Sequence, residues 1–218
     1  MTIARWGLGI LVVVGAYGPW RATEAQVRQT VEAGVHYSTL DYDQAYSFWD
    51  TGWRFSFTGG AAVEIPLGER WALAPGLRYV QKGNQVRYDL RPALPAAGEF
   101  RILQDYLAVA VRLRFRPLSS RRMAVCIGPE VAFLFSAHSV TVSAIPAQFV
   151  TETSYDDIRD DLKKVDFSVA AGAEVPFPVE NHEVFVALRY SEGLVGVAPE
   201  WASDWSTRGI ESVVGLRW

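Results

Sequence analysis

The chain is 218 residues long, and 50% of its residues are hydrophobic while 21% are charged. This length fits one domain, and the composition is too apolar for an intrinsically disordered protein. The formal net charge of −3 provides no basic excess that could bind a row of phosphates, which excludes nucleic acid as a partner. One cysteine, Cys126, and three scattered histidines exclude an internal disulfide and a Cys/His zinc site, so we expect no metal and no cofactor.

The first 25 residues have the pattern of a cleaved secretory signal. Arg5 precedes an apolar run over 6–17, and the small-residue segment 22–25 follows it. The alternative is a membrane anchor, but the run is shorter than the roughly 20 residues that a helix needs to cross a bilayer. We therefore expect an exported protein whose domain spans residues 26–218.

The rest of the chain alternates between apolar and polar residues with a period of two. Such alternation is typical of a β-strand with one apolar face, and helical periodicity is convincing nowhere except for a turn or two within 156–164. Eight segments follow the pattern, which are 31–37, 55–65, 71–81, 103–115, 123–135, 165–177, 184–190 and 210–218. The sequence therefore predicts an all-β protein.

The connections between these segments alternate strictly in length. Short turns lie at 66–70, 117–121 and 178–182, whereas long polar or aromatic loops lie at 41–51, 82–100, 138–162 and 194–206. Barrels of the bacterial outer membrane have short periplasmic turns, long extracellular loops, an even number of strands and both termini in the periplasm. We therefore predict an eight-stranded antiparallel up-and-down transmembrane β-barrel in the outer membrane.

The aromatic residues provide a second test of this topology, because the turns define the direction of each strand. On the apolar face, aromatic side chains gather at the two strand ends and small aliphatic ones lie between them, as expected at the two boundaries between water and lipid. The expected interface aromatics are Trp71, Phe115, Phe177 and Trp218 on the periplasmic side and Tyr37, Phe55, Tyr79, Phe135, Phe167 and Tyr190 on the outer side.

The opposite face of the strands carries glycines and charged residues. A barrel of eight strands encloses a lumen that side chains fill, and buried charges persist there only as ion pairs. We therefore expect a salt-bridged polar lumen without an open pore, built from Glu32, Arg54, Glu64, Arg78, Arg112, Arg114, Glu130, Asp166, Glu174, Arg189, Glu211 and Arg217.

Three residues depart from the pattern. Asp105 is a charge on the lipid-facing side, which costs little at the outer end of its strand. Pro75 and Pro129 each remove a hydrogen-bond donor from a strand that has two neighbours, so we expect β-bulges at both.

Several motifs resemble those of the PorT-like, porin-family outer membrane protein β-barrel domain. These are Gly52–Gly83, with 62–66 and 77–83 inside it, and the shorter runs 106–109, 127–131, 165–173, 188–194 and 215–218. The resemblance covers nearly the whole domain and implies an integral outer-membrane barrel without a catalytic site, some of whose relatives are tied to protein secretion. Family members more often end in Phe, and the resemblance implies that the barrel-assembly machinery reads Trp218 in the same way.

A lipid-modifying enzyme is the alternative function. It would need a nucleophile, a base and an orienting carboxylate at the outer rim, and His138 with Ser136 or Ser139 is the only such His–Ser proximity there. We favour a solvated loop histidine at this position and assign His36 to the polar lumen. The acidic run 156–161 lacks the spacing and the glycine of a calcium loop.

The long loops are the remaining candidates for function. Their aromatic residues could bind a protein or a glycan, or could pack on one another and anchor at the membrane interface; these residues are Tyr42, Tyr46, Phe48, Trp49, Trp201 and Trp205. We expect a non-catalytic barrel with a structural or docking role, in contact with outer-membrane lipid. A soluble lipocalin-like carrier is disfavoured, because its lumen would be apolar.

Overall fold

The computed structural model describes residues 27–42, 49–89, 97–117, 123–145, 150–197 and 205–218, so the predicted signal segment lies outside the described residues. The strands are β1 (Arg28–Tyr42), β2 (Trp49–Gly52), β3 (Arg54–Pro66), β4 (Trp71–Asp89), β5 (Ala97–Phe115), β6 (Ala124–Ile145), β7 (Val150–Asp157), β8 (Val165–Val179), β9 (His182–Gly193) and β10 (Trp205–Arg217), with one 3-10 helix, η2 (Arg159–Asp161). The helix occupies the segment in which a helical turn was predicted.

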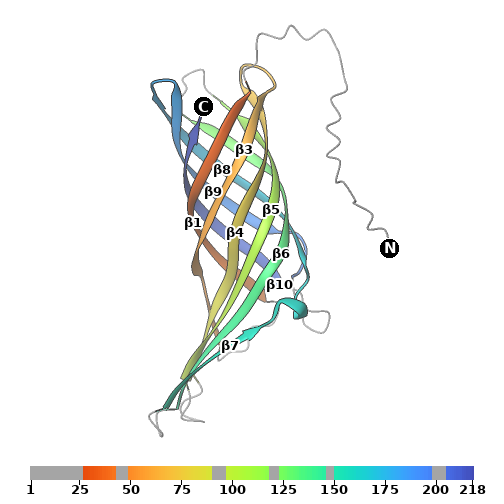
Figure 1. Cartoon of the computed structure of the whole chain (residues 1–218), viewed down its shortest axis with the longest axis vertical. Coiled ribbons are helices and arrows are strands. Elements are labelled where there is room, and N and C mark those ends of the chain that lie inside the picture. Colours follow the sequence, from red (N-terminus) through yellow and green to blue (C-terminus); the bar gives the residue numbers. More distant parts are fainter. Residues whose placement is uncertain (1–26, 43–48, 90–96, 118–122, 146–149, 198–204) are drawn as a thin grey trace, which may run out of the picture.

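Eight of these strands close into a barrel (Figure 1). The order β4-β3-β1-β10-β9-β8-β6-β5 is antiparallel throughout, and pairing of β4 with β5 completes the ring. The first and last strands pair from Thr30 with Arg217 to Tyr42 with Trp205. This confirms the predicted fold. No helix in the described part of the chain is long and apolar enough to span a membrane.

The two ends of the barrel differ. At one end, which we call the turn end, lie the short connections 67–70 and 180–181 together with the start of β1 and the end of β10. The tight turn between β8 and β9 places Glu180 in the left-handed region, with φ of 52°. The third predicted turn lies largely outside the described residues. The other end, the extension end, carries the long connections.

Large apolar side chains cover the outside of the cylinder. Phe55 and Phe57 are each 71% exposed, and Val109 and Leu188 also face outward, whereas their neighbours Ala108 and Ala187 point inward and are buried. The alternation follows directly from strand geometry, in which successive side chains lie on opposite faces. A continuous apolar exterior of this extent is stable only against lipid or another apolar surface.

Three strands continue beyond the barrel at the extension end. The β4–β5 pairing runs without interruption from Trp71 opposite Phe115 to Asp89 opposite Ala97, and β6 stays paired with β5 as far as Ala144. Strand β2 adds to the free side of β4 and β7 to the free side of β6, which gives the narrow projection in Figure 1. Much of 82–100 and 138–162 is therefore strand, and the prediction of long loops there was wrong.

The bulges predicted at the two prolines are also absent from the described sheet. The register of β3 on β4 is the same on both sides of Pro75, and the register of β5 on β6 is the same on both sides of Pro129. At each proline, two successive residue pairs of the ladder are missing instead. At Gly128, next to Pro129, a Cβ would lie 2.0 Å from the Val111 carbonyl oxygen. The sheet thus accommodates the proline by leaving out the backbone pairing beside it in one of its two ladders. The strands approach closely at Gly128, where a residue with a Cβ would not fit.

A register shift occurs elsewhere, in the β5–β6 pair. Asp105 lies opposite Ser136 while Tyr106 lies opposite Leu134, so that Phe135 is an extra residue on β6. Phe135 and Ser136 both lie on the outer side, and the inward positions of β6 change from even to odd numbers beyond them.

Candidate functional site

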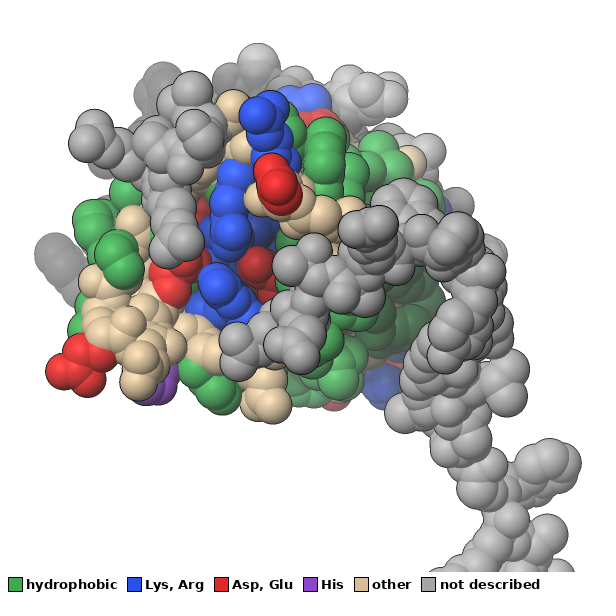
Figure 2. All heavy atoms as spheres, turned by 90° about the horizontal axis from the view of Figure 1, so that it is seen from above, with side chains coloured by type: hydrophobic (Ala, Val, Ile, Leu, Met, Phe, Trp, Pro, Cys, Tyr) green, Lys and Arg blue, Asp and Glu red, His purple; other side chains and the backbone are tan. Residues whose placement is uncertain are grey.

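The inward positions of the barrel strands carry two groups of ion pairs. Seen from the turn end, Lys and Arg side chains with neighbouring Asp and Glu side chains occupy the middle of the molecule, and hydrophobic side chains lie around them (Figure 2). Because alternate residues of each strand face the axis, the arginines and glutamates of separate strands meet there.

The central group lies midway along the lumen. Arg189 binds both carboxylate oxygens of Glu32, at 2.9 and 2.7 Å, and also lies 3.0 Å from Glu211. Arg112 adds a second cation to Glu32 at 3.0 Å.

The same group continues toward the extension end. Arg78 pairs with Glu211 and, at 2.9 Å, with Glu130, and Lys82 pairs with Asp166 at 2.9 Å. All eight side chains are at most 11% exposed, and four cations balance four carboxylates. The complete members are Glu32, Arg78, Lys82, Arg112, Glu130, Asp166, Arg189 and Glu211.

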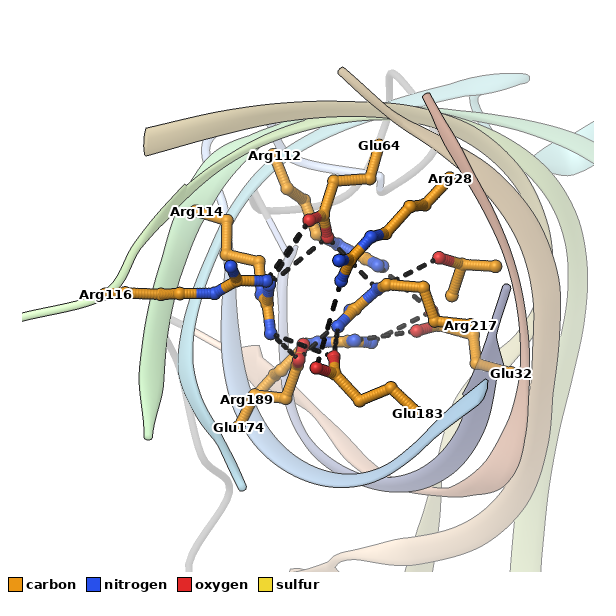
Figure 3. Close-up of polar contacts among 11 residues, drawn as sticks. Arg28, Glu32, Glu64, Arg112, Arg114, Arg116, Glu174, Glu183, Arg189 and Arg217 are labelled. Carbon is orange, nitrogen blue, oxygen red and sulfur yellow. Dashed lines mark hydrogen bonds and ion pairs between the residues drawn. The ribbon is translucent and has the colours of Figure 1, made fainter. Parts of the chain in front are cut away.

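The turn-end group closes the lumen at the other end (Figure 3). Arg217 lies 3.1 Å from Glu64 and 3.0 Å from Glu174, and it also pairs with Glu183. Arg114 pairs with Glu174 and lies 3.3 Å from Glu64, so that Arg114 and Arg217 share both of these carboxylates. Half-exposed Arg28 and Arg116 complete this group at its outer edge.

These contacts make the lumen a polar plug. An isolated buried charge is strongly unfavourable, but each carboxylate here accepts hydrogen bonds from at least one cation on another strand. The planar fork of arginine can bind two carboxylates at once, as Arg78, Arg114, Arg189 and Arg217 do.

The structure brings together every residue of the predicted lumen set except Arg54. Arg54 stands at the first position of β3, near the extension end, and donates to the side chain of Gln81 at 3.1 Å. Sequence analysis missed Lys82, Arg28, Arg116 and Glu183. Lys82 continues the inward alternation of Arg78 and Val80, but it was assigned to a loop; the alternation itself was the signal that could have identified it.

An apolar lid covers the central group at the extension end. Its buried side chains are Leu40, Ile102, Leu134, Leu162 and Val197. Leu162 follows η2, and the backbone N–H of Ile158 donates to the carbonyl of Ala137 at 3.1 Å, which holds the segment after β7 against the barrel mouth. The lid separates the ion pairs from the extension.

The predicted interface aromatics all lie on the outer surface. Toward the extension end, the rings of Tyr37 and Phe55 are 4.4 Å apart, and at the turn end the rings of Trp71 and Phe115 are also 4.4 Å apart. The other members of the predicted set, all exposed, are Tyr79, Phe135, Phe167, Phe177, Tyr190 and Trp218.

Asp105 is stabilised on the outer face by its neighbours. The Tyr79 hydroxyl donates to Asp105 Oδ1 at 2.7 Å and the Gln81 amide donates to the same oxygen at 2.8 Å. Because the carboxylate keeps these hydrogen bonds, Asp105 is tolerated near the membrane boundary.

The histidines lie in different places. Ser136 and His138 lie together on the outer face, with Ser136 Oγ 3.3 Å from His138 Nδ1, whereas Ser139 points inward and is buried. Asp157 is the register partner of His138 on β7, but its Oδ1 accepts the backbone N–H of Arg159. His36 lies in the lumen, where its Nδ1 is 3.0 Å from the Gln81 carbonyl.

The acidic run shows no arrangement for a metal. Lys164 donates to Asp160 at 2.9 Å, and this bond holds the pKa of the exposed Asp160 carboxyl below its usual value. No group of three or more His, Cys, Asp or Glu side chains within the described ranges could hold a metal ion. The side chains of the six loop aromatics lie outside the described part of the chain.

Several solved structures of other proteins are similar to this chain. Ail of Yersinia pestis, in complex with the heparin analogue sucrose octasulfate, is similar at 12% identity and a TM-score of 0.44, over 88% of this chain and 99% of that one. Neisserial surface protein A is similar at 9% identity and a TM-score of 0.41, over 87% and 95% of the two chains. OprG from Pseudomonas aeruginosa is similar at 10% identity and a TM-score of 0.40, over 89% and 97%.

No curated protein sequence matches significantly. The model of the outer membrane protein β-barrel domain matches residues 22–198, which is most of the chain. The chain therefore belongs to the outer membrane protein β-barrel family and is a β-barrel protein of the bacterial outer membrane.

Proposed function

We propose that this protein is a non-catalytic barrel that docks a partner outside the cell through the projecting part of its sheet. The observation that carries the proposal is the continuation of β4, β5 and β6 beyond the barrel, flanked by β2 and β7. Ordering a sheet of this kind costs conformational entropy, and it lies beyond the ring of eight strands that closes the barrel. A binding role explains why it is retained.

The edge of this sheet is suited to recognition. Strand β7 pairs with β6 and has no other strand partner in the described structure, so one side of its backbone is available to add a further strand. The side chains of Ser154, Tyr155, Asp156 and Asp157 are exposed along it. Two carboxylates at this edge favour a partner segment with basic residues and discourage self-association.

The lumen supports a docking role over transport. Paired charges and the apolar lid occupy the interior of the barrel along its length. We propose that the barrel has no open pore and that the chain is similar to the PorT-like members of the family, on the motifs quoted above. The C-terminal strand, which ends in outward-facing Trp218, is proposed as the segment that the assembly machinery recognises.

The docking proposal can be tested by photo-crosslinking in intact cells. A photoreactive residue at Tyr155, on the projection, should yield a discrete adduct that is lost when Thr153→Pro removes a backbone donor from β7. The same residue at Leu67, exposed in a turn at the opposite end, is the matched control and should not yield that adduct. Equal adducts from both positions, or none from Tyr155, would contradict the proposal.

A second candidate function is lipid modification at the outer rim. The specific observation is the Ser136–His138 contact, which places a hydroxyl beside an imidazole near the lipid boundary. The candidate requires that Ser136→Ala and His138→Ala each change the lipid profile of cells that carry the protein. Unchanged lipid in both variants would exclude it, and Ser139→Ala, at a buried inward position, is the control.

A further inference from the structure

Four buried side chains in and beside the central group present polar atoms without partners. These are both amide atoms of Gln104, the hydroxyls of Tyr106 and Ser168, and Oδ1 of Asp166. Gln104, Tyr106 and Asp166 are 0% exposed and Ser168 is 2% exposed. Buried polar atoms in native proteins are almost always hydrogen-bonded, either to protein or to ordered water.

These residues lie on two strands that flank β6. Gln104 and Tyr106 are successive inward residues of β5, and Asp166 and Ser168 are successive inward residues of β8. Strand β6 lies between them and presents the small, fully buried side chain of Ala132, which is the register partner of both Ala108 and Asp166. Between Ala108 of β5 and Asp166 of β8, strand β6 therefore contributes only a methyl group.

Lys82 links the two sides. It is the register partner of Gln104, its Nζ lies 2.9 Å from Asp166 Oδ2, and it lies 5.5 Å from the centre of the Tyr106 ring. Thr207 also donates to Asp166 Oδ2, at 3.0 Å, so that Oδ1 is the carboxylate oxygen that remains for another donor.

The chemistry of this site selects a neutral ligand. The four cations of the central group already balance its four carboxylates, which leaves no net charge for an ion to neutralise. The unpartnered atoms include donors, on Gln104, Tyr106 and Ser168, and acceptors, on Gln104 and Asp166. The ligand must therefore donate and accept hydrogen bonds and be small enough to fit beside Ala132.

We propose that this cluster is an internal water site, in which ordered water molecules bridge β5 and β8 beneath the apolar lid. The bridge connects strands that are not neighbours in the sheet, and it completes the hydrogen bonding of Asp166 beside Lys82. The site does not depend on what the projection binds.

The first test removes one hydroxyl. The substitution Tyr106→Phe removes the hydroxyl and, with it, the hydrogen bond to the proposed water. The urea midpoint of the full-length barrel in detergent should therefore fall. Removal of a hydroxyl that has no partner would leave the midpoint unchanged or raise it, and that result overturns the proposal. Tyr155→Phe, at a side chain that is 73% exposed, is the matched control and should leave the midpoint unchanged.

The second test detects water directly. In the 15N-labelled protein, the Gln104 side-chain amide protons should show cross-peaks to a long-lived water. Protected amide protons without such cross-peaks would overturn the proposal. A further control replaces K⁺ or Na⁺ with choline at constant ionic strength. If the urea midpoint changes, a cation occupies the site and the water proposal is overturned.

Discussion

Single charged residues in the lumen have more than one partner. Arg189 joins Glu32 of β1 to Glu211 of β10, and Arg217 joins Glu64 of β3 to Glu174 of β8. These contacts lie between residues far apart in the sequence, so they tie the first strands to the last. Removing one partner leaves a buried charge uncompensated, which costs far more than the intact pair contributes.

The first prediction concerns Arg189. Arg189→Ala leaves Glu32 and Glu211 short of a cation at buried positions, and we expect the free energy of unfolding to fall by roughly 3–5 kcal/mol. Urea unfolding in detergent measures the loss. Arg87→Ala removes a side chain that is 70% exposed and should change the value by no more than about 0.5 kcal/mol. Similar effects of the two substitutions would show that the lumen pairs are not desolvated.

At the scale of the element, the bulge in β6 explains an error of the sequence analysis. The inward residues are even-numbered up to Leu134 and odd-numbered from Ala137, because Phe135 and Ser136 share the outer side. The alternation of apolar and polar residues with a period of two therefore ends at Phe135, and the sequence analysis assigned the following residues to a loop. The physical continuity of the strand comes from its pairing with β5 and β7, which periodicity cannot detect.

The bulge allows a prediction about deletions. Deleting Ser136 removes one of the two successive outward residues of the bulge, so Ala137 still faces inward and His138 outward, and we expect a folded barrel with heat-modifiable migration on gels. Deleting Val169 in the regular strand β8 moves every following side chain to the opposite face and should abolish that migration. If both deletions fold equally well, the assigned register is wrong.

The lid supports another prediction at this scale. Leu162→Ala removes a buried contact that holds the segment after β7, so the Ile158 amide should exchange with deuterium faster and the barrel should lose up to about 2–5 kcal/mol of stability. Hydrogen exchange measures the first effect and urea unfolding the second. Leu194→Ala, at a side chain that is 65% exposed, should change neither.

The whole molecule combines an apolar exterior with a charged interior, the reverse of a soluble barrel. The exterior is stable because lipid covers it, and the interior is stable because the closed sheet holds each charge against an opposite one. Closure also leaves no free strand edge within the membrane-facing cylinder, so open edges occur only on the projection.

This arrangement predicts how the protein behaves in a bilayer. Unheated protein should migrate differently from boiled protein on a gel, because the closed barrel resists detergent at room temperature. In planar bilayers we expect no conductance of a large pore, since ion pairs fill the lumen and the lid covers them. Large, stable channel steps from the purified protein would contradict the plugged interior.

The sequence by itself determined the barrel, its strand number and the outward direction of its apolar side chains. These properties are local: alternation with a period of two assigns each residue to a face, and the lengths of the turns order the strands. Eleven of the twelve expected lumen charges lie in ion pairs for the same reason, as their positions follow from alternation alone.

The tertiary structure alone decided the remaining features. The stagger of distant strands around the barrel decides which arginine pairs with which carboxylate. It also brings Lys82 into the lumen ion pairs and leaves Arg54 outside them. The projection and the gaps at Pro75 and Pro129 depend on pairing with neighbouring strands, which supplies hydrogen bonds that no local pattern encodes. Register is a relation between strands, so residue spacing within one strand cannot specify it.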